Sequence, residues 1–179
     1  TDHPGYLSFI PSAPTEASKL FDLIVSASAI YGGSWLEGAG AVYAENEVLS
    51  WLASECGLPT SAGGVFVQGG TIGNLSALVA ARHHFATPTG KRLAFVCSSE
   101  AHSSLKSAAR IMDVDIVVAK ADEKGQLHGS AVAAALAADD PARIFAVVAT
   151  AGTTNFGIVD HVASIAEVTK QHGKWLHVD

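Results

Sequence analysis

Short apolar runs alternate with longer amphipathic stretches from residue 61 to the last residue. Almost uninterrupted apolar character marks the runs at residues 64–67, 93–97, 115–119, 144–149 and 175–178. Such runs are typical of strands buried on both faces of a sheet. Helical spacing of apolar residues predicts helices between them, at residues 72–85, 103–111, 130–138 and 162–172. Strands that alternate with helices predict an α/β domain, with a mostly parallel sheet covered by helices in three layers.

The first 60 residues follow a different pattern. Apolar residues recur at helical spacing over residues 20–30, behind Thr15, a residue type that caps helix starts. A second helical pattern covers residues 42–56 and is followed by Gly57 and Pro59, the usual chemistry of a helix end. We therefore divide the chain into residues 1–60, which hold two helices, and residues 61–179, which hold the alternating pattern.

Composition narrows the function classes. With 179 residues, 49% hydrophobic and 16% charged, the chain is predicted to be soluble and globular. A net charge of -6 argues against a nucleic-acid surface, and no apolar stretch approaches the roughly 20 residues of a membrane span. The two cysteines, Cys56 and Cys97, form neither a disulfide framework nor a CxxC metal site. We expect buried thiols in a cytoplasmic protein, without metal, nucleic-acid or membrane partners.

Ligands of open α/β sheets lie beyond the carboxyl ends of the strands, so the residues after each predicted strand are candidates for a site. After the first run, residues 68–74 read Gln-Gly-Gly-Thr-Ile-Gly-Asn and lead into a helix. Small residues allow backbone N–H groups to approach an anion, and a helix start favours negative charge, so the segment could hold a phosphate. It has neither a dinucleotide fingerprint nor a P-loop. A tight strand-to-helix turn explains the glycines equally well.

Three later segments place functional groups at the same predicted edge. His102, after the second run, offers a flat ring that can stack on a flat cofactor, although a serine-capped helix start would make it incidental. Residues 150–155 supply hydroxyls on a flexible backbone, or simply a turn. Asp179 follows the last apolar run, where a buried carboxylate needs a cationic partner; a surface aspartate that begins a loop is the alternative.

In this order and spacing, the motifs resemble those of the group II pyridoxal phosphate (PLP) dependent amino acid decarboxylases, which include aromatic amino acid, glutamate and histidine decarboxylases. The resemblance extends from His3 to Asp179. It rests on His3-Pro4 with Phe-Ile-Pro-Ser-Ala-Pro at 9–14, Gly69-Gly70-Thr71 with Asn74-Leu75, Ala-His-Ser-Ser at 101–104, Gly152-Thr153-Thr154 with Gly157 and Asp160, and Trp-Leu-His-Val-Asp at 175–179. It implies part of the large domain of PLP-dependent transferase fold type I.

The resemblance also implies roles for individual residues. Gly70 and Thr71 would hold the cofactor phosphate, His102 would stack on the pyridine ring, and Thr154 would contact the cofactor near the ring. Asp179 would bond the pyridinium nitrogen and keep it protonated, so that the ring serves as an electron sink. His102 and Asp179 are thus the candidate catalytic residues. The opening segment would line the substrate pocket through Phe9, Ile10 and Ser12.

By resemblance, the full-length protein would be a homodimer that decarboxylates an L-amino acid to an amine and carbon dioxide. The residues leave other reactions of the scaffold open: an aminotransferase, an aldehyde-forming oxidase or a sulfur lyase, and also an inactive fragment. Residues 1–60 would then be the substrate-pocket segment with its helices, and residues 61–179 the first part of the PLP-binding domain.

Two departures from the family pattern stand out. Ile72 takes the place of an acidic residue that commonly follows the phosphate-binding Ser or Thr. The family also carries a His-Lys pair downstream of the strand-end aspartate, and no such pair occurs in this chain. None of its lysines matches that motif: Lys91, Lys106, Lys120, Lys124, Lys170 and Lys174. Because the chain also lacks a first Met and ends on a strand pattern, we expect a fragment that ends before the Schiff-base lysine.

Overall fold

A computed structural model describes residues 3–6, 12–86 and 90–179. The chain divides into two compact units, Thr1–Phe66 and Val67–Asp179. The sequence pattern placed the boundary after residue 60, six residues earlier than the division in the structure. The functional meaning that we gave to the two segments stays a prediction.

The first unit contains two helices. The helix α1 (Glu16–Ser28) begins behind Thr15, whose hydroxyl accepts a hydrogen bond from the Ser18 N–H at 3.2 Å. The helix α2 (Trp35–Glu55) begins seven residues before the predicted start, because Ser34 caps it by accepting from the Glu37 N–H at 3.3 Å. Gly38 kinks α2 at φ -120°, where a Cβ would clash with the Tyr31 carbonyl.

The strand that we predicted at residues 64–67 is wrong. These residues form no regular element, and in the described part of the chain no strand pairs with them. The side chains of Val65 and Phe66 are exposed, and the Phe66 N–H donates to the Glu45 carboxylate at 2.9 Å. Apolar character alone cannot make a strand, since a strand also needs a neighbour for its backbone groups.

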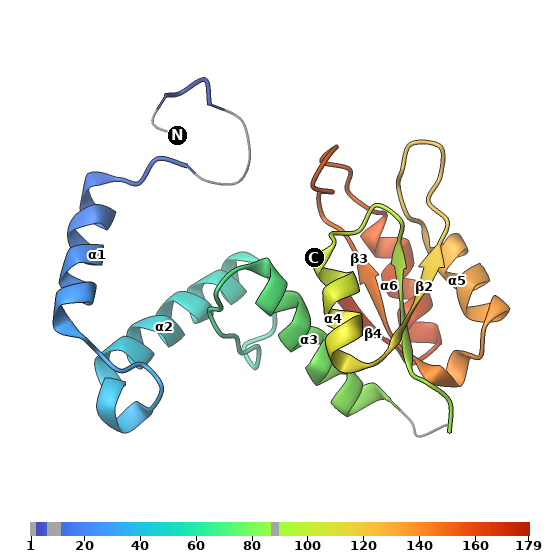
Figure 1. The fold of residues 1–179 in the computed structure, drawn as a ribbon, viewed down its shortest axis with the longest axis horizontal. Helices are drawn as coiled ribbons and strands as arrows, with labels where there is room; N and C mark the ends of the chain where they lie inside the picture. Colours follow the sequence, from blue (N-terminus) through green and yellow to red (C-terminus); the bar gives the residue numbers. More distant parts are fainter. Residues whose placement is uncertain (1–2, 7–11, 87–89) are drawn as a thin grey trace. The chain divides into compact units, whose positions relative to one another are not determined.

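The second unit is a four-stranded parallel sheet between helices, as the alternating pattern predicted (Figure 1). The strand order is β2-β1-β3-β4. In chain order its elements are α3 (Gly70–Phe85), β1 (Ala94–Ser98), α4 (Ser104–Met112), β2 (Asp115–Ala119), α5 (Gly129–Ala138), a short 3-10 helix (Pro141–Arg143), β3 (Ile144–Ala149), α6 (Val162–Gln171) and β4 (Trp175–Val178).

Side chains of the central strands alternate between two hydrophobic clusters. Phe95 and Cys97 of β1 pack in a cluster with α3 and α4, whereas Ala94 and Val96 pack in a cluster with α5 and α6. All residues of β1 and β3 are buried, while the outer strands β2 and β4 are only partly covered. This arrangement confirms the predicted α/β/α layers and explains the uninterrupted apolar runs of β1 and β3.

The two cysteines differ in their surroundings. Cys97 is buried in β1, as predicted, and burial raises the pKa of its thiol to about 12. The prediction for Cys56 is wrong, because this thiol is exposed just after α2, a helix whose buried residues comprise Gly38 alone. Among the described residues, no helix combines the length and the apolar character that crossing a bilayer requires.

Candidate functional site

The sheet reverses its strand order between β1 and β3. From β1 the chain passes through α4 to β2 on one side, whereas β3 lies on the other side of β1 and leads through α6 to β4. Adjacent connections therefore diverge at the carboxyl ends of β1 and β3. Such a switch point is where open α/β sheets bind ligands.

A cavity of about 300 Å³ lies at this switch point. His102, in the segment after β1, lines it together with Thr154, in the segment after β3. The other lining residues are Ser99, Glu100, Ala101, Ser103, Lys106 and Asn155. Two residues that the sequence singled out 52 positions apart are thus brought to the same cavity.

The imidazole of His102 is held by the start of α4. Its Nδ1 accepts a hydrogen bond from the Ser104 N–H at 3.2 Å and lies 2.8 Å from the Ser104 hydroxyl. Ser103 occupies the N-cap position but forms no side-chain cap. The alternative in which a serine caps this helix and the histidine is incidental therefore does not describe the structure, because His102 itself satisfies a free amide of the first turn.

The glycine turn forms an open helix start. Gly69 has φ +90°, a conformation that L side chains rarely adopt, and the next residue begins α3. No described side chain caps this helix, and a Cβ added at Gly69 or Gly70 would meet no atom within 4 Å. Gly70 and Thr71 are exposed. The first turn of α3 therefore leaves backbone donors and open space for an anion.

Asn74, one turn into α3, links this helix start to the rest of the sheet edge. It is buried; its amide nitrogen donates to Ser104 Oγ at 3.0 Å, and its amide oxygen lies 2.7 Å from His177 Nε2. His177 is the residue before the last position of β4. The glycine turn, the segment carrying His102 and the end of β4 are therefore tied together at one edge of the second unit.

Asp179 lies beside the segment that follows β3. Its backbone N–H donates to the Ala149 carbonyl at 2.9 Å, and its carbonyl accepts from the Ala151 N–H at 2.7 Å. Its carboxylate is partly exposed and partly offsets the effect of burial on His177, where desolvation lowers the pKa of the imidazole. Thr150, next to Ala151, carries a hydroxyl oxygen that is buried without a partner among the described atoms.

A buried carboxylate fixes the segment after β3. Asp160 accepts from the Leu127 N–H and from the Thr150 N–H, both at 2.8 Å. The sequence offered Asp160 and His177 only as parts of family motifs, and Ser104 as part of a motif and as a possible helix cap. The long-range contacts of Ser104 and His177 join residues 30 and 103 positions apart, which no local pattern reveals.

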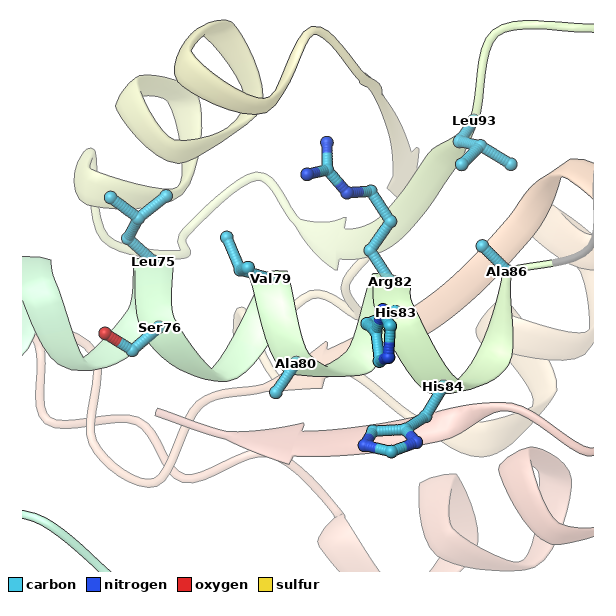
Figure 2. A pocket seen from close by; sticks show the side chains of 9 residues that line it. All are labelled: Leu75, Ser76, Val79, Ala80, Arg82, His83, His84, Ala86 and Leu93. Carbon is cyan, nitrogen blue, oxygen red and sulfur yellow. The ribbon is translucent and has the colours of Figure 1, made fainter.

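A larger cavity, of about 1060 Å³, contains none of the predicted site residues. It is a surface hollow along α3, where Leu75, Val79 and Arg82 project from one side of the helix (Figure 2). The Arg82 guanidinium is already bound to the Met112 carbonyl at 2.8 Å. By volume alone this hollow would be the better candidate for a ligand site. The smaller cavity at the switch point is the better candidate by its polar groups and its place at the strand ends.

Not every predicted site residue can be placed at this edge. Phe9 and Ile10 lie outside the described residues, and Ser12 is an exposed residue of the first unit. In the described ranges, no cluster of three or more His, Cys, Asp or Glu side chains could hold a metal ion. The predicted roles of His102, Asp179, Gly70, Thr71 and Thr154 stay predictions, now with a common location.

Comparison with known proteins gives one consistent family. The family model described as "Pyridoxal-dependent decarboxylase conserved domain" matches residues 1–179. An aromatic-L-amino-acid decarboxylase of Bacillus atrophaeus is 32% identical over 99% of this chain and 38% of its own length. An L-2,4-diaminobutyrate decarboxylase of Rhizobium meliloti (strain 1021) is also 32% identical, over 99% of this chain and 37% of its own length.

A solved structure agrees with the sequence comparisons. The crystal structure of Oryza sativa TDC with PLP and tryptamine is 30% identical, with a TM-score of 0.85 over 96% of this chain and 41% of that one. The chain spans about two-fifths of the length of the curated relatives that it matches.

Proposed function

Because this chain belongs to the pyridoxal-dependent decarboxylase family and has the fold of type I PLP enzymes, we propose that the whole protein removes carbon dioxide from an L-amino acid with PLP as cofactor. One observation carries this proposal. An uncapped helix start, a histidine that lines a cavity and a strand-end carboxylate occupy the same carboxyl edge of a parallel sheet.

The groups at this edge fit the chemistry of PLP. The free amides of α3 with the Thr71 hydroxyl suit a phosphate, the His102 ring suits a flat aromatic face, and the Asp179 carboxylate suits a protonated ring nitrogen. The buried Thr150 hydroxyl, which has no partner among the described atoms, leaves hydrogen-bonding capacity unused directly after β3. When bound, the cofactor supplies an electron sink for the departing carboxylate's electron pair.

The proposed function assigns a role to each residue of the site. Gly70 and Thr71 would hold the phosphate, His102 would stack on the ring, and Thr154, which lines the same cavity, would contact the cofactor near the ring. Asp179 holds a proton on the ring nitrogen by placing a negative charge beside it. The lysine that binds the cofactor covalently is not assigned to any lysine of this chain.

Replacement of Asp179 tests the proposed reaction. Asp179→Asn keeps the shape of the side chain but removes the charge, so we expect the rate of carbon dioxide release by the whole protein to fall about 100-fold or more. Glu123→Gln, which removes an exposed carboxylate of the same unit, is the matched control. Trapping of carbon dioxide and chromatography of the amine, keto acid or aldehyde product separate decarboxylation from the other reactions of this scaffold. Turnover of Asp179→Asn at the control's rate would contradict the assignment.

The substrate, the partner and the compartment are further parts of the proposal. The relatives' names support assays with aromatic amino acids and diaminobutyrate, and Phe9, Ile10 and Ser12 are proposed to contact the side chain of the substrate. Large exposed apolar side chains of the first unit, such as Phe21 and Leu36, support a homodimer, which sedimentation analysis would test. The exposed thiol of Cys56 suits the reducing cytoplasm, which fractionation of cells would test.

A further inference from the structure

Four polar side chains form a continuous chain of contacts behind the cavity. His177 Nε2 lies 2.7 Å from the Asn74 amide oxygen, and the Asn74 amide nitrogen lies 3.0 Å from Ser104 Oγ. Ser104 Oγ in turn lies 2.8 Å from His102 Nδ1. Asn74 and Ser104 are both buried, so water does not compete for their hydrogen bonds.

A backbone amide fixes the direction of these hydrogen bonds. The Ser104 N–H can only donate, and it points at His102 Nδ1 at 3.2 Å, so that nitrogen must be an unprotonated acceptor. The Ser104 hydroxyl, 2.8 Å from the same nitrogen, must therefore donate to it and accept from Asn74. The direction of a hydroxyl proton and the orientation of a side-chain amide are not normally visible in a structure. Here the Ser104 backbone N–H, whose direction is fixed, determines the hydroxyl direction of Ser104 and the amide orientation of Asn74.

The same logic extends to the far end of the chain of contacts. Since the Asn74 nitrogen donates to Ser104, its oxygen faces His177 and must accept from the imidazole Nε2–H. The contact requires only a proton on Nε2; burial lowers the pKa of His177 and so favours the neutral ring, in which this contact selects the Nε2–H tautomer. Each member thus donates toward His102, from His177 through Asn74 to Ser104.

We propose that Ser104, Asn74 and His177 are positioning residues that hold the His102 imidazole in its Nε2–H tautomer, with the plane of the ring set for stacking on the cofactor. This inference rests on the proposed function only for the identity of the stacked ligand. The tautomer and the hydrogen bonds belong to this chain alone and exist without the cofactor.

Histidine nitrogen resonances of the cofactor-free whole protein test the hydrogen bonds directly. With ¹⁵N-labelled histidine, we expect His102 to show an unprotonated Nδ1 and a protonated Nε2, and His177 to show a protonated Nε2. Ser104→Ala should move the His102 Nδ1 resonance toward that of a free acceptor, because one of two donors is lost. Ser107→Ala, the same change at an exposed position of α4, should leave it in place.

A second pair of variants keeps the inference testable if Ser104→Ala, a change at a buried residue, fails to fold. His177 lies on β4, two side chains away from His102. His177→Gln retains a donor for Asn74 and should preserve the His102 resonances, whereas His177→Leu removes that donor and should shift Nδ1 in the direction of Ser104→Ala but less far. A merely structural role of β4 would not distinguish the two.

Cofactor titration connects the hydrogen bonds to function. We expect Ser104→Ala to weaken PLP binding about 3- to 10-fold, the effect of one net hydrogen bond, and Ser107→Ala to bind as the unmodified protein does. A protonated His102 Nδ1, an unmoved resonance in Ser104→Ala, or unchanged PLP affinity in that variant would overturn the inference. Absence of PLP binding by the unmodified protein would instead contradict the proposed function, while the predicted tautomer would still report on the hydrogen bonds.

Discussion

The two units of this chain use apolar residues in opposite ways. The helix α1 has no buried residue, although its sequence is rich in Leu, Ile, Val and Phe, and Phe21 is 66% exposed. In the second unit, β1 and β3 bury all of their residues, and Phe145 of β3 is 0% exposed. A hydrophobic pattern thus predicts the type of an element but does not say which surface will cover it. The second unit has its own core and its own site, whereas the first leaves its apolar side chains available to a partner.

Removal of a large aromatic side chain from each unit should give the largest contrast. Phe145→Ala leaves a cavity next to Phe95, whose ring centroid lies 6.2 Å from that of Phe145. We expect the free energy of unfolding of the second unit to fall by about 3–5 kcal/mol. Phe21→Ala should change that stability by less than about 0.5 kcal/mol. Amide hydrogen exchange of β1 in the whole protein measures both. If Phe21 lies in a dimer interface, its variant should instead weaken self-association in sedimentation experiments. Equal losses of β1 protection would erase the distinction between the units.

Removal of one carboxylate from each unit should also destabilise the second unit more than the first, but by less than removal of an aromatic side chain. Asp160→Ala leaves the buried N–H groups of Leu127 and Thr150 without a partner and should destabilise the second unit by about 2–4 kcal/mol. Asp22→Ala removes an exposed carboxylate of α1 and should have little effect. Exchange of the Leu127 and Thr150 amides identifies the cause. Their unchanged protection in Asp160→Ala would show that other groups can replace the carboxylate.

Lowering the pH should give the smallest difference in stability between the two units. It depends on Asp139, which lies before β3 and so at the edge of the sheet opposite the candidate site. The Arg143 guanidinium, which bonds both oxygens of Asp139 at 2.7 Å, lowers the pKa of that carboxyl from 3.8 to about 2. Because the folded state binds this proton less tightly than the unfolded state, the stabilisation is present above pH about 4 and is lost as the pH falls toward 2.

The matched variants are Asp139→Asn and Glu16→Gln. In Asp139→Asn, which cannot titrate, protection of β1 against exchange should decline less steeply between pH 4 and 2 than in the unmodified protein. Glu16 pairs with Lys19 on exposed α1, and Glu16→Gln should leave the pH dependence as it is. A decline as steep in Asp139→Asn as in the unmodified protein would assign the acid sensitivity to other groups.

The sequence predicted the parallel sheet well, for a physical reason. The strand at 144–149 is bounded by helices and buried by its neighbours, so its local pattern and its tertiary environment agree. The same reasoning failed at residues 64–67, where Val65 and Phe66 are equally apolar but no strand among the described residues pairs with them. The predicted burial of Cys56 was wrong for a related reason, since helical spacing cannot show whether other parts of the protein will cover a helix.

The candidate site could be predicted only in part. His102, Thr154 and Asp179 each follow a strand, so the rule for strand ends directed attention to them before their location was known. The proposed positioning of His102 by Ser104 and His177 could not be recognised, because it depends on Asn74, which lies 30 and 103 residues away from them. Long-range hydrogen bonds leave no periodicity in a sequence, although a buried asparagine near the start of a helix is a signal worth following.

The central claim is that one edge of the second unit holds a single PLP molecule between the start of α3 and Asp179. A crystal structure of the whole protein with PLP tests it most directly. We predict the phosphate at the amides of Gly70 and Thr71, the ring against His102, and the ring nitrogen within hydrogen-bonding distance of the Asp179 carboxylate. Cofactor density elsewhere, or a helix start and a carboxylate that face separate cavities, would contradict the account.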